Sequence, residues 1–188
     1  DNSFSTSNLP LRAGKGWLYE GGIRVPMIVK WPQKGNAGTE SNMPVISTDF
    51  YPTILDILGL SFGKHVPDGI SLAPLLKKQD TAQKKISDRP IFWHFPHYSN
   101  HGMQSPSGAV RCGDYKLIEY FENNTVQLFN LSSDPGEQVD LSQIQMEKTK
   151  ELRKILHQWR KEINAQMMRP NPEYIPAKSK MTTKTTKK

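Results

Sequence analysis

The sequence predicts an α/β fold that ends in a small antiparallel sheet covered by a helix. Two observations carry this prediction. Within the first 60 residues, a short β-branched and apolar run is followed by a capped helical segment, which is the element order of α/β folds. Beyond Arg89 the pattern changes to short alternating segments and a final amphipathic helix. The length of 188 residues and the 36% of apolar residues are sufficient to bury a core.

The first part of the chain, residues 1–88, carries the α/β pattern. Residues 24–31 (RVPMIVKW) form an apolar run closed by Pro32, so we expect a buried strand there. Residues 48–59 combine a capping residue, a proline in the first turn, an apolar face and a terminating glycine, which together predict a helix. Residues 63–88 hold mixed turn and short-helix signals and are expected to connect this part to the next.

The second part, residues 89–177, is predicted to be a sheet with one covering helix. Strands are expected at residues 90–95, 107–113, 114–121 and 125–131. Asn123 and Asn124 have the loop chemistry of a hairpin between the last two. The apolar stripe of the final helix should pack on one face of the sheet with no chemistry of its own; it consists of Leu152, Ile155, Leu156, Trp159, Ile163 and Met167.

Charge and cysteine content exclude several classes of function. Five of the lysines behind the net charge of +7 lie in the Thr/Lys tail, residues 178–188, which contains no acid and leaves only +2 for the rest. That composition is typical of a disordered end, and nucleic-acid binding is not expected without a basic stripe interleaved with aromatic residues. No apolar run is long enough to span a bilayer. Cys112, the only cysteine, lies in a strand-like segment that favours a structural thiol.

The most informative segment is LPLRAGKGWLYEGGIRVPMIVKWP, residues 9–32. Lys15 lies between Gly14 and Gly16, and a second pair, Gly21 and Gly22, follows soon after. Glycines remove side-chain bulk, so a ligand or another chain segment can approach the lysine closely. The residues alone leave two interpretations open, a ligand-binding lysine and a turn whose lysine lies in water.

Five blocks resemble the C-terminal part of type I, arylsulfatase-like sulfatases and occur in the same order. They are TSNLPLRAGKGWLYEGGIRVPMIVKWP, PVISTDFYPTILDILGL, DGISLAPLL, GDYKLIEYF and LFNLSSDPGEQVDL. The resemblance runs from Ser7 to about Ala177. It implies an alkaline-phosphatase-like α/β fold, with residues 1–88 at the end of the catalytic domain and residues 89–177 as a C-terminal subdomain. It also implies a periplasmic or extracellular location. Since the chain starts with Asp1 rather than Met, we expect a piece of a longer protein.

The resemblance implies a catalytic and substrate-binding role for Lys15. The matching lysine of the family reaches the sulfate group, where a fixed ammonium stabilises the negative charge that develops as the S–O bond breaks. Glu20 and Arg24 are expected to act as braces, with Glu20 accepting hydrogen bonds from the backbone or from Arg24 and holding the bend at Gly21 and Gly22.

Asp1 and Asn2 resemble a pair of residues that supplies oxygen ligands to calcium in the family. Ser3 stands where the family has a glycine, and Lys15 follows early, so a polar chain end without metal stays an alternative. The formylglycine nucleophile of the family comes from a Cys/Ser-x-Pro-x-Arg motif. Neither Cys112 nor Ser133 begins such a motif, so the nucleophile and most calcium ligands are expected outside this chain.

His94 and His97 are expected at the rim of the substrate pocket, with a purely structural role as the alternative for each. Two functions follow from the resemblance. The chain is either the C-terminal portion of a calcium-dependent sulfatase that hydrolyses sulfate esters, with a sulfated small molecule or glycan as substrate, or a non-catalytic module that binds sulfated glycans. A Cys/Ser-x-Pro-x-Arg motif in the preceding part of the gene would distinguish them. The oligomeric state cannot be read from the sequence.

Overall fold

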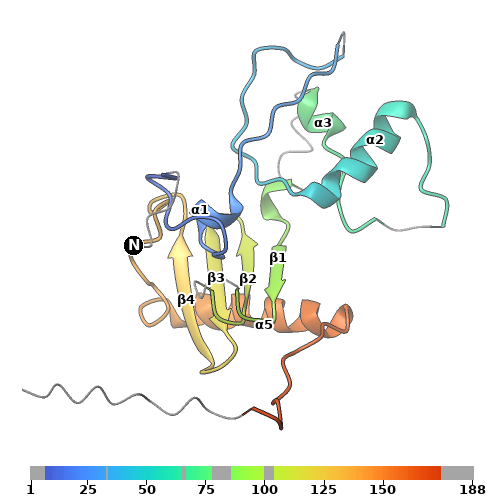
Figure 1. The fold of residues 1–188 in the computed structure, drawn as a ribbon. Helices are drawn as coiled ribbons and strands as arrows, with labels where there is room; N and C mark the ends of the chain where they lie inside the picture. Colours follow the sequence, from blue (N-terminus) through green and yellow to red (C-terminus); the bar gives the residue numbers. More distant parts are fainter. Residues whose placement is uncertain (1–6, 33, 65–66, 78–85, 100–103, 175–188) are drawn as a thin grey trace, which may run out of the picture.

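The computed structural model describes residues 7–32, 34–64, 67–77, 86–99 and 104–174 (Figure 1). Its helices are α1 (Glu20–Ile23), the 3-10 helix η1 (Ser47–Asp49), α2 (Phe50–Leu58), α3 (Ala73–Leu76) and α5 (Met146–Glu162). Its strands are β1 (Ile91–Phe95), β2 (Ser107–Cys112), β3 (Tyr115–Tyr120) and β4 (Thr125–Asn130). No helix among these residues is both long and apolar enough to cross a membrane.

The four strands form one antiparallel sheet in the order β1-β2-β3-β4, as the alternation predicted. The hairpin at Asn123 and Asn124 is confirmed, and Asn124 adopts the left-handed backbone conformation with φ 55°. Gly113, with φ 58°, occupies the same region in the turn between β2 and β3. Both turns therefore hold residues that tolerate the positive φ that tight hairpins require.

Helix α5 covers one face of this sheet, which confirms the predicted packing (Figure 1). Leu152 and Leu156 are buried against an apolar cluster from β2, β3 and β4. Trp159 stacks on Phe92 of β1 with ring centroids 4.5 Å apart. The predicted stripe was too long, however. The helix ends at Glu162 because Asn164 turns into the left-handed conformation with φ 49°, so Ile163 and Met167 lie beyond it.

Residues 13–23 cover the opposite face of the sheet, which the sequence did not predict. Leu18 and Tyr19 are buried in one cluster with apolar side chains of the sheet, namely Ala109, Ile118, Phe129 and Leu131. Aromatic contacts tighten this layer, since the ring centroids of Tyr19 and Phe129 lie 6.2 Å apart. These contacts cross the domain boundary expected at residue 88, and the division itself stays a prediction. The sheet is thus a middle layer between α5 and the segment around Lys15.

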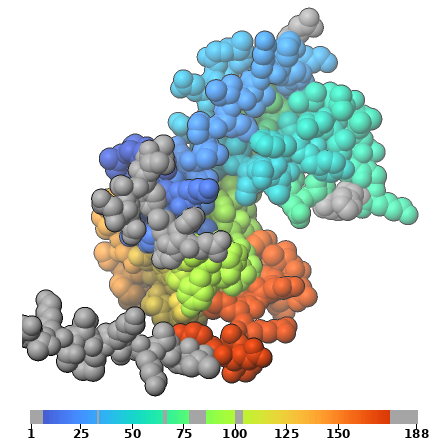
Figure 2. Space-filling model, viewed as in Figure 1, coloured from blue at the N-terminus to red at the C-terminus, as the bar shows by residue number. Residues whose placement is uncertain are grey.

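The expected buried strand at residues 24–31 is wrong for this chain. These residues have no strand beside them among the described residues, and Ile28 is 96% exposed. A central strand is buried only when neighbouring strands and helices cover it, and the described part of the chain supplies none there. Figure 2 shows this stretch within a lobe, formed by residues 25–32, 34–64 and 67–76, that projects away from the rest of the described chain.

The helix predicted at residues 48–59 is confirmed as α2, and Gly59 ends it in the left-handed conformation with φ 67°. Asp49, fully buried before this helix, holds three segments together. Its carboxylate accepts hydrogen bonds from the N–H groups of Ile46 and Ile70, at 2.9 and 3.0 Å, and from the guanidinium of Arg89 at 2.6 Å. Burial opposes ionisation, but the bonds and charge of Arg89 prevail and lower the Asp49 pKa.

Candidate functional site

Lys15 lies exposed at the tip of a tight loop on the sheet face opposite α5. Gly14 before it is buried, and its carbonyl accepts a hydrogen bond from the N–H of Trp17 at 3.2 Å. Gly16 has φ 97°, a conformation that side chains rarely permit. Within the described residues, Lys15 makes no hydrogen bond or ion pair. The ammonium is therefore available to an anion while its backbone is held.

Gly21 and Gly22 are needed because the backbone of this loop folds directly onto them. A Cβ atom on Gly22 would lie 2.1 Å from the carbonyl oxygen of Trp17, and one on Gly21 would lie 2.3 Å from that of Arg12. Both distances are far below contact distance, and the obstructing atoms are backbone that cannot rotate away. The second glycine pair thus permits close packing under the loop, whereas the sequence indicated only a bend there.

The start of the loop is fixed by Arg12. Its guanidinium donates to the carbonyl oxygen of Glu137 at 2.8 Å and lies 3.9 Å from the ring centroid of Tyr19. The carbonyl of Arg12 accepts a hydrogen bond from the N–H of Gly21 at 2.9 Å. Arg12 therefore ties residues before and after Lys15 to each other and to the turn that follows β4.

The end of the loop is fixed by a buried ionic cluster of Glu20, Lys116 and Glu137, which we call the carboxylate-lysine cluster. The ammonium of Lys116 lies 3.0 Å from a carboxylate oxygen of Glu20 and 2.9 Å from one of Glu137. The backbone N–H of Glu20 donates to the other Glu137 oxygen at 2.6 Å. All three side chains are at most 2% exposed. Three of the sequence blocks meet here.

The cluster holds two carboxylates and one ammonium, so its charge balance depends on neighbours at the rim. Arg111 and Arg24 lie 3.7 and 3.9 Å from the second oxygen of Glu20. Burial raises the pKa of Glu137, and the Lys116 charge only partly counters this effect. Glu20 braces the loop as expected, but its main partner is Lys116 and not Arg24.

Sequence reasoning missed Lys116, although one signal pointed to it. In β3, side chains alternate between the two faces, so Lys116 shares its face with Ile118, which is completely buried. A lysine at a core-facing position of a strand requires a buried partner. What the sequence could not show is which carboxylates supply it, because Glu20 and Glu137 lie 96 and 21 residues away in the chain.

The two predicted histidines have different partners in the structure. His94 is on the α5 face: its Nε2 bonds to the carbonyl oxygen of Gln166 at 2.7 Å, and its ring lies 5.6 Å from that of Phe121. The Nε2 atom therefore carries the proton. The segment of Lys15 covers the other face, so the structure does not bring His94 to Lys15.

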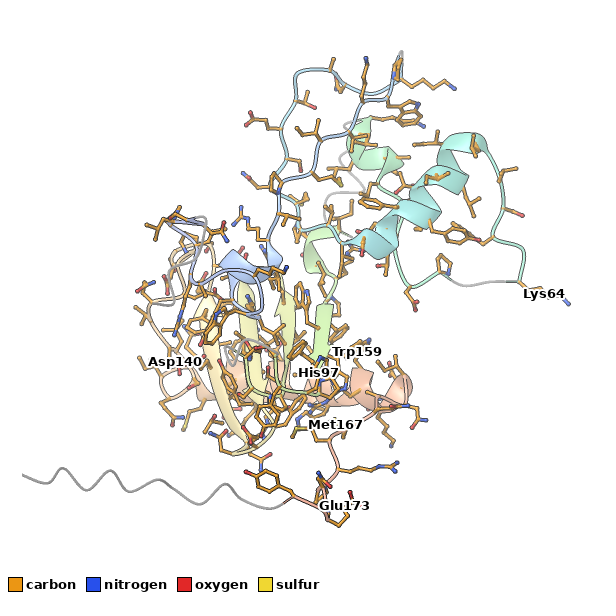
Figure 3. The ribbon with its side chains drawn as sticks, in the orientation of Figure 1. Lys64, His97, Asp140, Trp159, Met167 and Glu173 are labelled. Carbon is orange, nitrogen blue, oxygen red and sulfur yellow. The ribbon has the colours of Figure 1, made fainter. Side chains whose placement is uncertain are left out.

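His97 follows β1 and is exposed (Figure 3). Its ring packs 3.9 Å from that of Phe95, a residue that lies in the same apolar cluster as Trp17 of the Lys15 loop. Of the two histidines, His97 is thus the one connected to the Lys15 side of the sheet. Its place at a substrate rim stays a prediction.

Asp1 and Asn2, the predicted calcium ligands, lie outside the described residues. Among the residues that the structure does describe, no group of three or more His, Cys, Asp or Glu side chains could hold a metal ion. Cys112 is half-buried, and burial, with Glu151 nearby, raises the pKa of its thiol, which favours the unreactive form as expected.

Comparison with known proteins places these features among sulfatases. Residues 13–166 match the family model described as N-sulphoglucosamine sulphohydrolase, C-terminal. A sulfatase of Formosa agariphila is 36% identical over 144 residues, which cover 72% of this chain and 26% of that protein. An N-acetylglucosamine-6-O-sulfatase of Bacteroides thetaiotaomicron is 25% identical over 151 residues, 79% of this chain and 27% of the relative.

A solved structure agrees with these matches. The crystal structure of Ps i-CgsB in complex with k-i-k-neocarrahexaose aligns with a TM-score of 0.65 and 30% sequence identity, over 81% of this chain and 32% of that one. The chain spans about a quarter of the length of the curated relatives that it matches.

Proposed function

Because the chain belongs to the sulfatase family and corresponds to its C-terminal region, we propose that it completes the active site of a sulfatase by presenting Lys15 to the sulfate group of the substrate. The complete enzyme hydrolyses a sulfate ester of a carbohydrate. Its formylglycine nucleophile and most of its calcium ligands belong to parts of the protein outside this chain.

One observation carries the proposal: Lys15 is exposed and without an ionic partner in the described structure, while the backbone on both sides of it is fixed. A surface lysine in an ordinary turn needs no such support. A lysine whose ammonium must contact a developing charge at a defined point does need that support. Electrostatic stabilisation of a transition state requires groups that are held in place before the reaction.

The chemistry of Lys15 follows from the charge change in the reaction. As the S–O bond breaks, the electron pair moves to the leaving alcohol oxygen, and the sulfate oxygens remain anionic. An ammonium within hydrogen-bond distance of these oxygens lowers the free energy of that charge distribution. Calcium, when bound, would supply a second positive charge for the sulfate group.

A carbohydrate substrate is supported by what the relatives act on or bind. One relative is an N-acetylglucosamine-6-O-sulfatase, and the crystal structure of Ps i-CgsB holds a neocarrahexaose. Enzymes that act on such external polymers work outside the cytoplasm, which is why we propose a periplasmic or extracellular location. A sulfated small molecule or glycan is the partner that this site would take.

The experiment that tests this function is an assay of the complete protein. The gene segment before Asp1 is read for a Cys/Ser-x-Pro-x-Arg motif, and the purified protein is incubated with N-acetylglucosamine 6-sulfate and with a sulfated carrageenan oligosaccharide. Release of inorganic sulfate is the expected result. A protein that lacks the motif, binds the oligosaccharide and releases no sulfate would instead be a non-catalytic binding module.

A further inference from the structure

We propose that Lys116 is a positioning residue for Lys15: from its buried place in β3, its ammonium fixes both ends of the loop that carries Lys15. The inference rests on the proposed function for its effect on turnover, whereas its effect on the loop can be measured independently.

Lys116 lies on the sheet face that residues 13–23 cover, and its ammonium contacts the carboxylates of Glu20 and Glu137 at 3.0 and 2.9 Å. Glu20 comes directly after the loop. Arg12 comes directly before the loop, and its guanidinium donates to the backbone carbonyl oxygen of Glu137 at 2.8 Å. One ammonium therefore connects the residues that begin and end the loop.

Two carboxylates that are almost completely removed from water repel each other unless a cation lies between them. Lys116 is that cation, since Arg111 and Arg24 approach only the second oxygen of Glu20, at 3.7 and 3.9 Å. Without the ammonium, one carboxylate must move away or take up a proton, and either change releases one end of the loop.

Between its two ends the loop is tied by the N–H of Leu18, which donates to the side-chain oxygen of Gln104 at 3.0 Å. The rest of the sheet is held by the α5 layer on the opposite face. Leu117, the next residue in β3, is completely buried in that layer. Leu117→Ala is thus a matched control that weakens the same strand without touching the loop.

The experiment is a double-mutant cycle in the complete enzyme, with turnover of a sulfated sugar corrected for the folded fraction. Lys116→Met keeps most of the length of the side chain and removes its charge. We expect it to lower kcat/KM by about 10-fold to 100-fold, the range for a reacting group displaced by an ångström or less. In a Lys15→Ala background it should cost less than about threefold, since a residue that acts through Lys15 has nothing left to position.

Hydrogen exchange supplies the second measurement. In Lys116→Met, the amides of residues 13–22 should exchange on the order of 10-fold faster while those of α5 change little. In Leu117→Ala, the amides of α5 should instead exchange faster, while those of residues 13–22 change little. Should Lys116→Met fail to fold, Glu137→Gln is the second variant. Its amide has one oxygen where the carboxylate uses two, so either the Glu20 N–H or the Lys116 ammonium loses its acceptor, and the loop amides should again exchange faster.

The outcomes are distinct. If Lys116→Met lowers kcat/KM by the same factor in the parent and in the Lys15→Ala background, the inference is overturned. Unchanged exchange of the loop amides in Lys116→Met would also overturn it. If Lys15→Ala alone leaves turnover intact, the role proposed for Lys15 is wrong, and the exchange experiment still decides whether Lys116 fixes the loop.

Discussion

The ammonium of Lys116 lies 3.0 Å from the carboxylate of Glu20, a residue 96 positions earlier in the chain, and both side chains are buried. This contact joins the glycine-rich segment of Lys15 to the middle of the sheet. It explains why this glycine-rich loop can hold Lys15 at a fixed point. The loop has little core of its own and takes its order from β3 and from the turn after β4.

Replacing Lys15 should affect catalysis more than replacing any other candidate residue in this chain. Lys15→Ala in the complete enzyme is expected to reduce turnover by about 100-fold to 1,000-fold, or ~3 to 4 kcal/mol, the usual cost of losing one preorganised donor to a developing charge. Lys15→Arg should restore it only in part, because a planar guanidinium does not replace a compact ammonium.

Steady-state kinetics of these variants, with His97→Ala beside them, provide the measurement. Lys154→Ala, at an exposed position of α5, is the charge-matched control. Turnover of Lys15→Ala within about threefold of the parent, a difference of only ~0.7 kcal/mol, would mean that Lys15 is a turn residue in water.

The 188-residue chain by itself should hydrolyse no aryl or sugar sulfate, with or without calcium, because its sequence contains no Cys/Ser-x-Pro-x-Arg motif. The measurement is sulfate release by the purified chain against buffer. Turnover that remains after a second purification would contradict the expectation.

The exposed apolar stretch of residues 24–31 should exchange its amide hydrogens rapidly in the 188-residue chain. It has no neighbouring strand among the described residues, and Val25 and Ile28 are 79% and 96% exposed. Exchange measured by mass spectrometry in the chain and in the complete enzyme checks this. We expect protection only in the latter, where further strands can cover the stretch.

Gly22→Ala should destabilise the loop more than the same change at an open glycine. The new Cβ would lie 2.1 Å from the Trp17 carbonyl oxygen, and relieving such an overlap typically costs about 1 to 3 kcal/mol or more. Gly113→Ala is the control. Gly113 has φ 58°, but a Cβ there would have no atom within 4 Å, so the variant should lose only about 1 to 2 kcal/mol of stability through backbone strain. Urea unfolding compares the two, and an equal loss would refute the close-packing argument.

The attachment of α5 should depend on pH through Glu119. This β3 carboxylate is 3% exposed and bonds to Arg153 at 2.7 Å, His157 at 2.9 Å and Arg160 at 2.6 Å. Burial alone would raise its pKa, but the bonds to His157 and Arg153 and the charge of Arg160 outweigh burial and lower it below the ordinary 4.5.

A carboxyl group whose pKa is lower in the folded state stabilises the fold above its unfolded pKa, and this contribution disappears as the pH falls through the folded value. Unfolding free energies of the chain should therefore decline below about pH 4.5. Glu119→Gln should lower the unfolding free energy by on the order of 2 kcal/mol near pH 7, the scale of a charged hydrogen bond. It should also remove much of the decline in stability at acid pH. An unchanged acid dependence in this variant would assign the effect to other carboxylates.

The sequence by itself determined the local elements of the second half. Alternation in 107–113 and 125–131 identified strands, and the stripe through Leu152 and Leu156 identified α5 and its packing on the sheet. The order of the five blocks identified the family. The strand and helix signals depend only on residues that are neighbours in the chain or lie on one face of one element.

Tertiary structure alone decided what surrounds Lys15. Residues 24–31 have the composition of a buried strand, yet burial depends on partners that the segment cannot specify, and here they are absent from the described residues. Lys116 and Glu137 joined the site only when the folded sheet brought them to Glu20. A buried charge is stable only beside its counter-charges, and which side chains provide them is fixed by the meeting of distant segments, which no local pattern in the sequence records.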